Sequence, residues 1–457
     1  MSDKNRFIPN GWGGAASPLQ SVTYVFPILV GITAIIVGFG IGEGQWLVGL
    51  LALFIPLVLL YPVQVGLGMF AVLIPFDTIA VLGQAEKGRT LTWFAGAAAI
   101  GILFGVGLVS KRLKPLPVAA VWWIVFTVWC IVTMVWGLNL KASLAQVPSS
   151  LALLGFYLAA TSIRYKKNEL QAITYLSILG GCVAAAYSAY LFSQGNYYEM
   201  GETRASLIVN GRATNPDGLA MTLLLPISFA FAYFLSSKRM LRKAIMLGVI
   251  ALTCMGLFLT MSRGAVLGLV TVIGVYVYRL KLGRKLVAPL ILLSIVLCFM
   301  PSVFFERFVE ASQSGGSGRT NIWKVGLVAF KHYGFFGAGF NNFPFAYTKY
   351  VNASPKFEGF DRDPHNVYLA IAVEAGIIGL FLFGGAVRNQ FKTASRIRKR
   401  APAKHMLVAT EAAACGLLVY SMFGNILWDK SFWFAWALLA AAGSVAEESP
   451  ETAVAEP

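Results

Sequence analysis

Apolar stretches long enough to cross a lipid bilayer recur from one end of this 457-residue chain to the other. A transmembrane helix needs about 20 predominantly apolar residues, with a range of roughly 17–25, to span a hydrocarbon core about 30 Å thick. The chain is 57% hydrophobic and 12% charged, whereas an average soluble domain carries about 25% charged residues. These features exclude an ordinary soluble domain and predict an all-α polytopic membrane protein.

The apolar stretches predict about 12–14 transmembrane helices, the lower number applying if the chain makes a re-entrant turn at Tyr61-Pro62. The predicted spans cover residues 24–41, 46–61, 63–82, 91–110, 118–137, 148–163, 170–193, 218–236, 244–260, 264–279, 286–300, 366–387, 406–426 and 431–446. The chain then divides into an N-terminal segment 1–23, helices within 24–300, one large loop with short helices over 301–365, helices within 366–446, and an acidic tail 447–457. The first residues lack the pattern of a cleaved signal peptide.

Basic residues gather in five clusters that follow alternate spans. The clusters lie at 111–114, 164–167, 238–243, 279–285 and 388–404, and they hold more than half of the 37 Lys and Arg without any Asp or Glu. Loops rich in Lys and Arg stay in the cytoplasm, and all five clusters agree with one alternating topology. We therefore expect both termini in the cytoplasm, and the loops 194–217, 261–263 and 301–365 on the outer side.

One of the three histidines, His365, lies where the polar loop meets a predicted span. A neutral imidazole can take a proton from a sugar hydroxyl, and its ordinary pKa near 6.5 suits that role at neutral pH. A structural alternative is an interfacial histidine that caps the helix starting near Asn366, after Pro364. His332 and His405 have no comparable position. Glu374 lies inside a span, where a carboxylate is costly and usually paired, so we expect it to make a structural hydrogen bond.

Arginines occupy similar junctions on the predicted outer side. Arg263 lies in a short turn between two spans, and Arg319 follows the flexible segment 314–318 at the start of an expected helix. A guanidinium binds phosphate in a bidentate manner and stays charged. Together with His365 these residues predict a base and an anion clamp. Snorkelling to lipid headgroups or a solvated loop charge would explain the same arginines without a function. Arg204 and Arg212 flank a loop that ends in 215–217, where they would either guide an anionic glycolipid into the site or be plain surface charges.

Other chemistries find less support. The five cysteines all lie in apolar runs and form no CxxC pair, which argues against disulfides or a cysteine metal site. The net charge of +17 does not indicate nucleic acid binding, because the basic residues punctuate membrane spans. Asp361 and Asp363 have a D-x-D spacing, but Arg362 separates them, and we predict neither a metal nor a cofactor.

Several short motifs, in order along roughly 200–380, resemble the O-antigen ligase and O-antigen polymerase superfamily of bacterial envelope proteins. They are Thr260-Met261-Ser262-Arg263-Gly264; Gly318-Arg319 with Trp323; Gly337-Ala338-Gly339-Phe340-Asn341-Asn342-Phe343; and His365-Asn366-Val367-Tyr368 with Glu374-Ala375-Gly376-Ile377-Ile378-Gly379-Leu380. Asn215-Pro216-Asp217 resembles the polar start of a central span in the family, with Asp where Asn is common. No single motif is specific, and 1–190 shows none.

The resemblance implies metal-independent transfer of a glycan from undecaprenyl diphosphate at the periplasmic face of the inner membrane. It makes His365, Arg263 and Arg319 the expected catalytic residues, and Arg204, Arg212, Trp323 and Asn366 the expected substrate-binding ones. The acceptor would be a lipid A-core sugar in a ligase, which we favour, or another lipid-linked chain in a polymerase. Two alternatives stay open: a metal-dependent membrane glycosyltransferase, and a flippase for lipid-linked oligosaccharides or a solute transporter. A transporter would be expected to show internal symmetry and ionisable groups deep in its spans.

Overall fold

The structure is a computed structural model that describes residues 57–77, 80–82, 89–198, 203–209, 212–283, 287–298, 302, 305, 318–400 and 405–447. The chain divides into two compact units, Met1–Val65 and Gly66–Pro457. Of the first unit, residues 57–65 are described, and all but Tyr61 are helical. The predicted segment 1–23, the predicted span 24–41, most of the span 46–61 and nearly all of the tail 447–457 lie outside the described residues.

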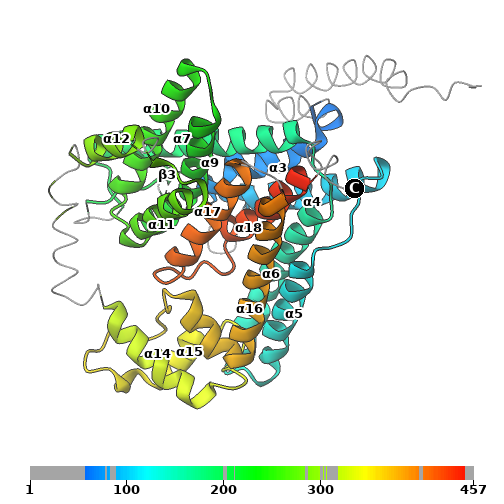
Figure 1. Cartoon of the computed structure of the whole chain (residues 1–457). Helices are drawn as coiled ribbons and strands as arrows, with labels where there is room; N and C mark the ends of the chain where they lie inside the picture. The colour runs from blue at the N-terminus through cyan, green and yellow to red at the C-terminus, as the bar shows by residue number, and fades with distance from the viewer. Residues whose placement is uncertain are drawn as a thin grey trace, which may run out of the picture. The chain divides into compact units, whose positions relative to one another are not determined.

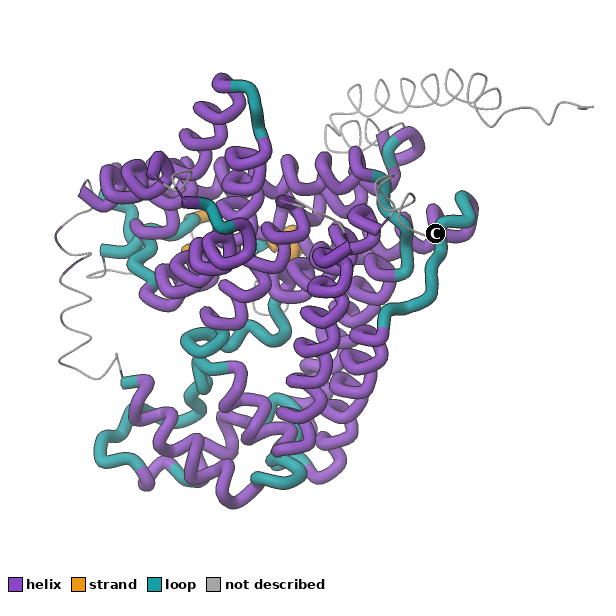
Figure 2. Tube along the Cα trace, in the orientation of Figure 1, coloured by secondary structure: helices purple, strands orange, loops and turns teal. Residues whose placement is uncertain are grey.

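Helices dominate the described part of the chain, as Figure 2 shows. They are α3 (Pro62–Leu73), α4 (Leu91–Val109), α5 (Val118–Val132), α6 (Leu140–Thr161), α7 (Lys167–Ser193), α8 (Pro216–Thr222), α9 (Leu224–Ser236), α10 (Met240–Leu259), α11 (Arg263–Leu280), α12 (Val287–Cys298), α14 (Arg319–Tyr333), α15 (Phe343–Lys349), α16 (Val367–Arg400), α17 (His405–Tyr420) and α18 (Lys430–Glu447). Short 3-10 turns cover Ile74–Phe76 (η1), Thr133–Trp136 (η2) and Val351–Ala353 (η4). Two small hairpins join β1 (Ala80–Leu82) to β2 (Arg89–Thr90) and β3 (Ile208–Val209) to β4 (Arg212–Ala213).

Eight of the helical stretches are long and apolar enough to cross a membrane, and three shorter apolar helices accompany them among the described residues. The protein is therefore an all-α polytopic membrane protein. Most predicted spans match these helices within a few residues. Larger differences occur at the predicted span 63–82, whose helical part ends at Phe76 before strand β1, and at 406–426, where α17 ends at Tyr420. In addition, α6 begins at Leu140 and not at 148, because Asn139 caps it by accepting a hydrogen bond from the Ala142 amide. Pro148 lies inside the helix, as membrane helices tolerate.

The predicted span 366–387 lies within the candidate membrane span Val367–Lys399, but α16 is not continuous there, because it breaks at Gly376. This glycine has φ 69° and ψ −168°, a combination that essentially only glycine adopts. In a straight helix Tyr368 and Phe383 would lie about 22 Å apart, yet their ring centroids are 6.1 Å apart. The segments 367–375 and 377–400 therefore fold back on each other. The Ala375 carbonyl at the break accepts a hydrogen bond from the Trp129 indole at 2.8 Å, which satisfies a group freed by the break.

The predicted cytoplasmic clusters come together in two pairs at helix ends of the second unit. The Arg112 guanidinium donates to the Arg164 carbonyl at 3.0 Å. Arg279 and Arg398 both form salt bridges at 2.5 Å with Glu411, which is 1% exposed. Proximity of the two clusters within each pair is what an alternating topology requires. The side of the membrane that they face stays a prediction.

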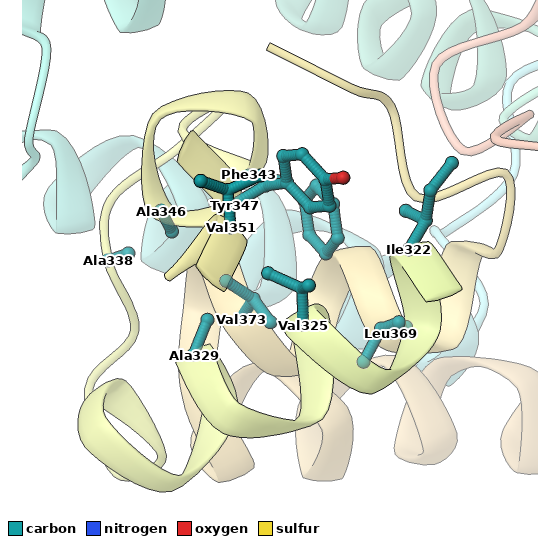
Figure 3. Close-up of a cluster of buried hydrophobic side chains, with 10 residues drawn as sticks. All are labelled: Ile322, Val325, Ala329, Ala338, Phe343, Ala346, Tyr347, Val351, Leu369 and Val373. Atoms are coloured by element: carbon teal, nitrogen blue, oxygen red, sulfur yellow. The ribbon is translucent and has the colours of Figure 1, made fainter. Parts of the chain in front are cut away.

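The segment 318–366 folds around α14 and α15, which Figure 1 shows beside the ends of α5 and α16. A hydrophobic cluster, drawn in Figure 3, connects α14 and α15 to the first segment of α16. Its buried members are Ile322, Val325, Ala329, Ala338, Phe343, Ala346, Tyr347, Val351, Leu369 and Val373. Burying a large apolar side chain contributes about 1.5–3 kcal/mol, so this cluster fixes the start of α14 relative to the start of α16. Those two starts carry Arg319 and, just before α16, His365.

Candidate active site

Asp217 joins several charged and polar side chains into one network. This network lies at the start of the span formed by α8 and α9 and at the start of α11, whereas basic clusters follow the other ends of both spans. Its carboxylate forms a salt bridge with Arg204 at 2.8 Å and another with Arg319 at 3.3 Å. The Ser262 side chain also hydrogen-bonds to it. Arg204 and Arg319 are 115 residues apart in their numbers, so one carboxylate joins the loop after α7 to the start of α14.

Local sequence explains why Asp217 is held in place. Asn215 caps α8 and accepts a hydrogen bond from the Asp217 amide at 2.9 Å, and Pro216 occupies the first turn, where its missing N–H costs nothing. The Tyr420 hydroxyl donates to the Asp217 carbonyl at 2.9 Å. Both the backbone and the carboxylate of this residue are therefore anchored by neighbouring elements.

The tight turn before α11 places Arg263 beside this network. Met261 has a φ of 56°, which lets the chain reverse between α10 and α11. Ser262 is the N-cap of α11 and contacts Asp217, and Arg263 is the first helical residue. The Arg204 guanidinium also donates to the Thr260 carbonyl at 2.9 Å. The turn, the Arg204 loop and Asp217 thus form one connected structure.

Arg319 is the first residue of α14, preceded by Gly318 with φ 76°. A side chain at Gly318 would collide with the carboxylate of Glu358, whose Oε2 lies 2.7 Å from an added Cβ. Glu358 also accepts a hydrogen bond from the Asn321 side chain at 2.8 Å. Glycine at 318 therefore permits the close approach that ties the loop before His365 to the start of α14.

His365 is half-buried and has a φ of 45°, unusual for a residue with a side chain. Its neighbours hold it on both sides: the Pro364 carbonyl accepts a hydrogen bond from the Trp323 indole at 2.9 Å, and the Asn366 side chain accepts one from the Leu369 amide at 3.0 Å. The residue that caps α16 is therefore Asn366, and the backbone at His365 is fixed in a strained conformation.

Burial lowers the pKa of His365 below its ordinary value, and the nearby Arg319 guanidinium lowers it further. The carboxylates of Asp363 and Asp217 act in the opposite direction without reversing the shift. At neutral pH the imidazole is consequently uncharged and able to accept a proton.

The structure brings some of the predicted site residues together and leaves others outside the network. Arg204, Arg319 and His365 come together around Asp217, with Arg263 in the adjoining turn and Trp323 beneath Pro364. Asn366 is engaged as a helix cap, and the side chain of Arg212 lies outside the described residues. As predicted, Glu374 makes a structural hydrogen bond, in which its carboxylate accepts from the Phe343 amide at 3.0 Å.

Two features escaped the sequence analysis. Asp217 was noted as part of a motif but not as a site residue, although a carboxylate at the start of a span is usually paired. Asp77, Asp429 and Lys430 also meet in space, with the Lys430 amine contacting the Asp77 carboxylate, and no motif indicated this.

Among the described residues, no group of three or more His, Cys, Asp or Glu side chains is arranged to hold a metal ion. Asp361, one half of the D-x-D spacing, pairs instead with Thr348, whose hydroxyl donates to it at 2.9 Å. A neutral imidazole beside several guanidiniums can remove a proton from a neutral nucleophile while an anionic leaving group is stabilised.

Residues 247–384 match the family described as O-antigen ligase. This range contains the turn with Arg263, the start of α14 with Arg319, His365 and the break in α16. No curated protein matches the chain.

Proposed function

We propose a specific reaction for the site, because residues 247–384 match the family described as O-antigen ligase, and this match supports glycan transfer in envelope glycan biosynthesis. The protein transfers a glycan from undecaprenyl diphosphate to a sugar hydroxyl of lipid A-core. The site faces the periplasm from the inner membrane, and both termini lie in the cytoplasm. The observation that carries the proposal is the half-buried His365 close to the Arg204–Asp217–Arg319 network.

The charges of the site suit a diphosphate. Arg204, Arg319 and Arg362 bring three positive charges, Arg263 in the adjoining turn adds a fourth, and Asp217, Asp363 and Glu358 bring three negative ones. The excess of positive charge favours an anionic ligand, and guanidinium groups match phosphate geometry. Preorganised donors of this kind typically lower a transition state by about 3–4 kcal/mol each.

The reaction then follows from the positions of these groups. His365 accepts the proton of the acceptor hydroxyl as its oxygen forms a bond to the anomeric carbon of the donor sugar. The bond from that carbon to the diphosphate oxygen breaks, and undecaprenyl diphosphate leaves with the electron pair, its charge neutralised by Arg263 and Arg319. Attack from the face opposite the leaving group inverts the anomeric centre, and this reaction needs neither a metal nor a cofactor.

The test uses purified protein, a synthetic polyprenyl-diphosphate glycan and lipid A-core, with EDTA present. We expect transfer by the wild-type protein and a loss of about 10²–10⁴-fold in His365→Ala, with His332→Ala as a matched control near wild-type rate. His332 stacks on Tyr350, ring centroids 4.6 Å apart, and makes no contact with the network. Undiminished turnover by His365→Ala would show that His365 is not the general base. Activity that requires a divalent cation would indicate a metal-dependent mechanism instead.

The acceptor is tested separately in cells. After deletion of the gene, a ligase leaves polymer that is not attached to lipid A-core, whereas a polymerase leaves single repeat units on the core. The second pattern would assign the same site to the extension of lipid-linked chains.

A further inference from the structure

A cavity of about 200 Å³ lies next to the candidate active site, between η1, the start of α8 and the start of α18. Its polar lining includes Asp77, Thr214, Asn215, Asp429 and Lys430. These residues come from three segments far apart in the sequence. The volume lies below the range of about 300–1,000 Å³ typical of pockets for drug-sized ligands, so the cavity suits one small ring.

The polar groups of this cavity suit an uncharged ligand rich in hydroxyl groups. The Lys430 amine contacts the Asp77 carboxylate and the hydroxyls of Thr90 and Thr92, the last two at 3.0 and 2.9 Å. Asp429 accepts a hydrogen bond from the Ser431 amide at 2.7 Å. Burial, together with the nearby Asp77, raises the pKa of Asp429 to about 6. Two carboxyl groups against one amine make the cavity unfavourable for a phosphate.

One short piece of chain separates the cavity from the arginine network. Asn215 and Gly218 line the cavity, while Asp217 between them pairs with Arg204 and Arg319. Tyr420 holds the Asp217 carbonyl, and the loop after Tyr420 leads to Asp429 and Lys430. Residues 215–218 thus separate two neighbouring binding regions. The anionic part of one ligand fits beside the arginines, and its neutral polyol part fits in the cavity.

We propose that this cavity binds one uncharged sugar ring of a glycan substrate, beside the arginines that hold the diphosphate. The inference rests on the proposed glycan transfer and deepens it, because it separates recognition of the sugar from recognition of the phosphate. The ring belongs either to the donor, next to its diphosphate, or to the acceptor, next to its reacting hydroxyl. Both offer the same hydroxyl groups to Asp77, Asn215 and Asp429.

Gly218 gives a sharp test, because its added Cβ would have the Asn215 Cβ, 4.0 Å away, as its nearest neighbour. Gly218→Leu should fill the cavity without moving the backbone, and Gly218→Ala is the matched control that leaves most of the space. Binding of neutral methyl glycosides of glucose, galactose and N-acetylglucosamine to the purified full chain is measured by saturation-transfer NMR. Binding of inorganic diphosphate is measured in parallel.

We expect at least one glycoside to bind the wild-type protein and Gly218→Ala, with binding reduced at least tenfold in Gly218→Leu and diphosphate binding retained. Asp429→Asn, which keeps the size of the side chain, should also weaken glycoside binding, and it serves if Gly218→Leu fails to fold. Absence of glycoside binding to the wild-type protein, or equal binding by Gly218→Leu, would overturn the proposal. These binding measurements do not depend on turnover. The sugar site can therefore be disproved while glycan transfer is confirmed, and glycan transfer can be disproved while the sugar site is confirmed.

Steady-state kinetics show whether the bound sugar ring belongs to the donor or to the acceptor. If the cavity holds the donor sugar, Gly218→Leu raises the KM for the lipid-linked donor and leaves the KM for lipid A-core unchanged. If it holds the acceptor sugar, the effect is reversed. Unchanged KM values for both substrates in a folded Gly218→Leu protein would also overturn the proposal.

Discussion

The proposed roles of Arg263 and Arg319 depend on the planar guanidinium group as well as on its charge, and lysine substitution separates the two. Lysine keeps the positive charge but presents a compact ammonium in place of the planar guanidinium fork. We expect Arg263→Lys and Arg319→Lys each to lower kcat/KM by about tenfold or more, equivalent to about 1.4 kcal/mol. Arg242→Lys, a change in an exposed residue of a basic cluster, is the matched control. Wild-type kcat/KM in both variants, at equal protein levels, would reduce the two arginines to surface charges.

The pH dependence of activity reports the state of His365. A base is active in its unprotonated form, and the pKa of His365 lies below its ordinary value of 6.5. Activity should therefore be constant above about pH 6.5 and should fall as the pH drops through that lowered pKa. In Arg319→Gln, which removes a positive neighbour, the pKa should rise and the fall should begin at a higher pH. A profile of kcat/KM against pH with the same acid limb in both proteins would exclude His365 as the titrating base.

At the scale of elements, the break in α16 separates the short segment that follows His365 from the rest of the helix. Gly376→Ala should destabilise the protein, because an alanine there would adopt a conformation worth about 1–3 kcal/mol of strain and its Cβ would lie 2.2 Å from the Phe335 carbonyl oxygen. Thermal unfolding in detergent measures the loss, and transfer activity should fall with it.

Gly384→Ala provides the comparison in the same helix. An added Cβ at Gly384 meets nothing within 4 Å, and alanine favours a helix over glycine by about 1 kcal/mol. We expect an unchanged or slightly higher midpoint for this variant. Equal midpoints for Gly376→Ala and the wild-type protein would mean that the fold-back tolerates a side chain and that the helix is continuous in the membrane.

The break also shows where sequence reasoning ends at this scale. The run from Val367 to Val387 is apolar throughout except for Glu374, so its hydropathy predicts one span. The reversal depends on a positive φ at Gly376 and on contacts with Phe335 and Trp129, which lie far away in the sequence. Hydropathy shows that a segment is apolar, but it does not show where the chain reverses its direction within that segment.

For the whole molecule, composition and hydropathy predicted the class and most helix positions, because each helix must satisfy its own backbone in the bilayer. His365 and Arg319 could be predicted as candidate site residues, because each lies at a junction between a polar loop and a helix. Asp217 and the cavity were not found, because their partners come from segments separated by up to 353 residues, as between Asp77 and Lys430. Such pairings depend on helix packing that no local pattern records.

The orientation in the membrane decides whether the site can meet a periplasmic substrate, and labelling tests it. With the native cysteines replaced, Lys356→Cys, at a side chain that is 74% exposed, should react with a membrane-impermeant maleimide in intact spheroplasts. Arg242→Cys, in an exposed position of a basic cluster, should react only after permeabilisation, because clusters of Lys and Arg are retained in the cytoplasm. Both should react equally in detergent, which controls for accessibility. Labelling of Arg242→Cys but not Lys356→Cys from outside would reverse the orientation, place His365 and the arginines in the cytoplasm, and remove the periplasmic donor from the proposed reaction.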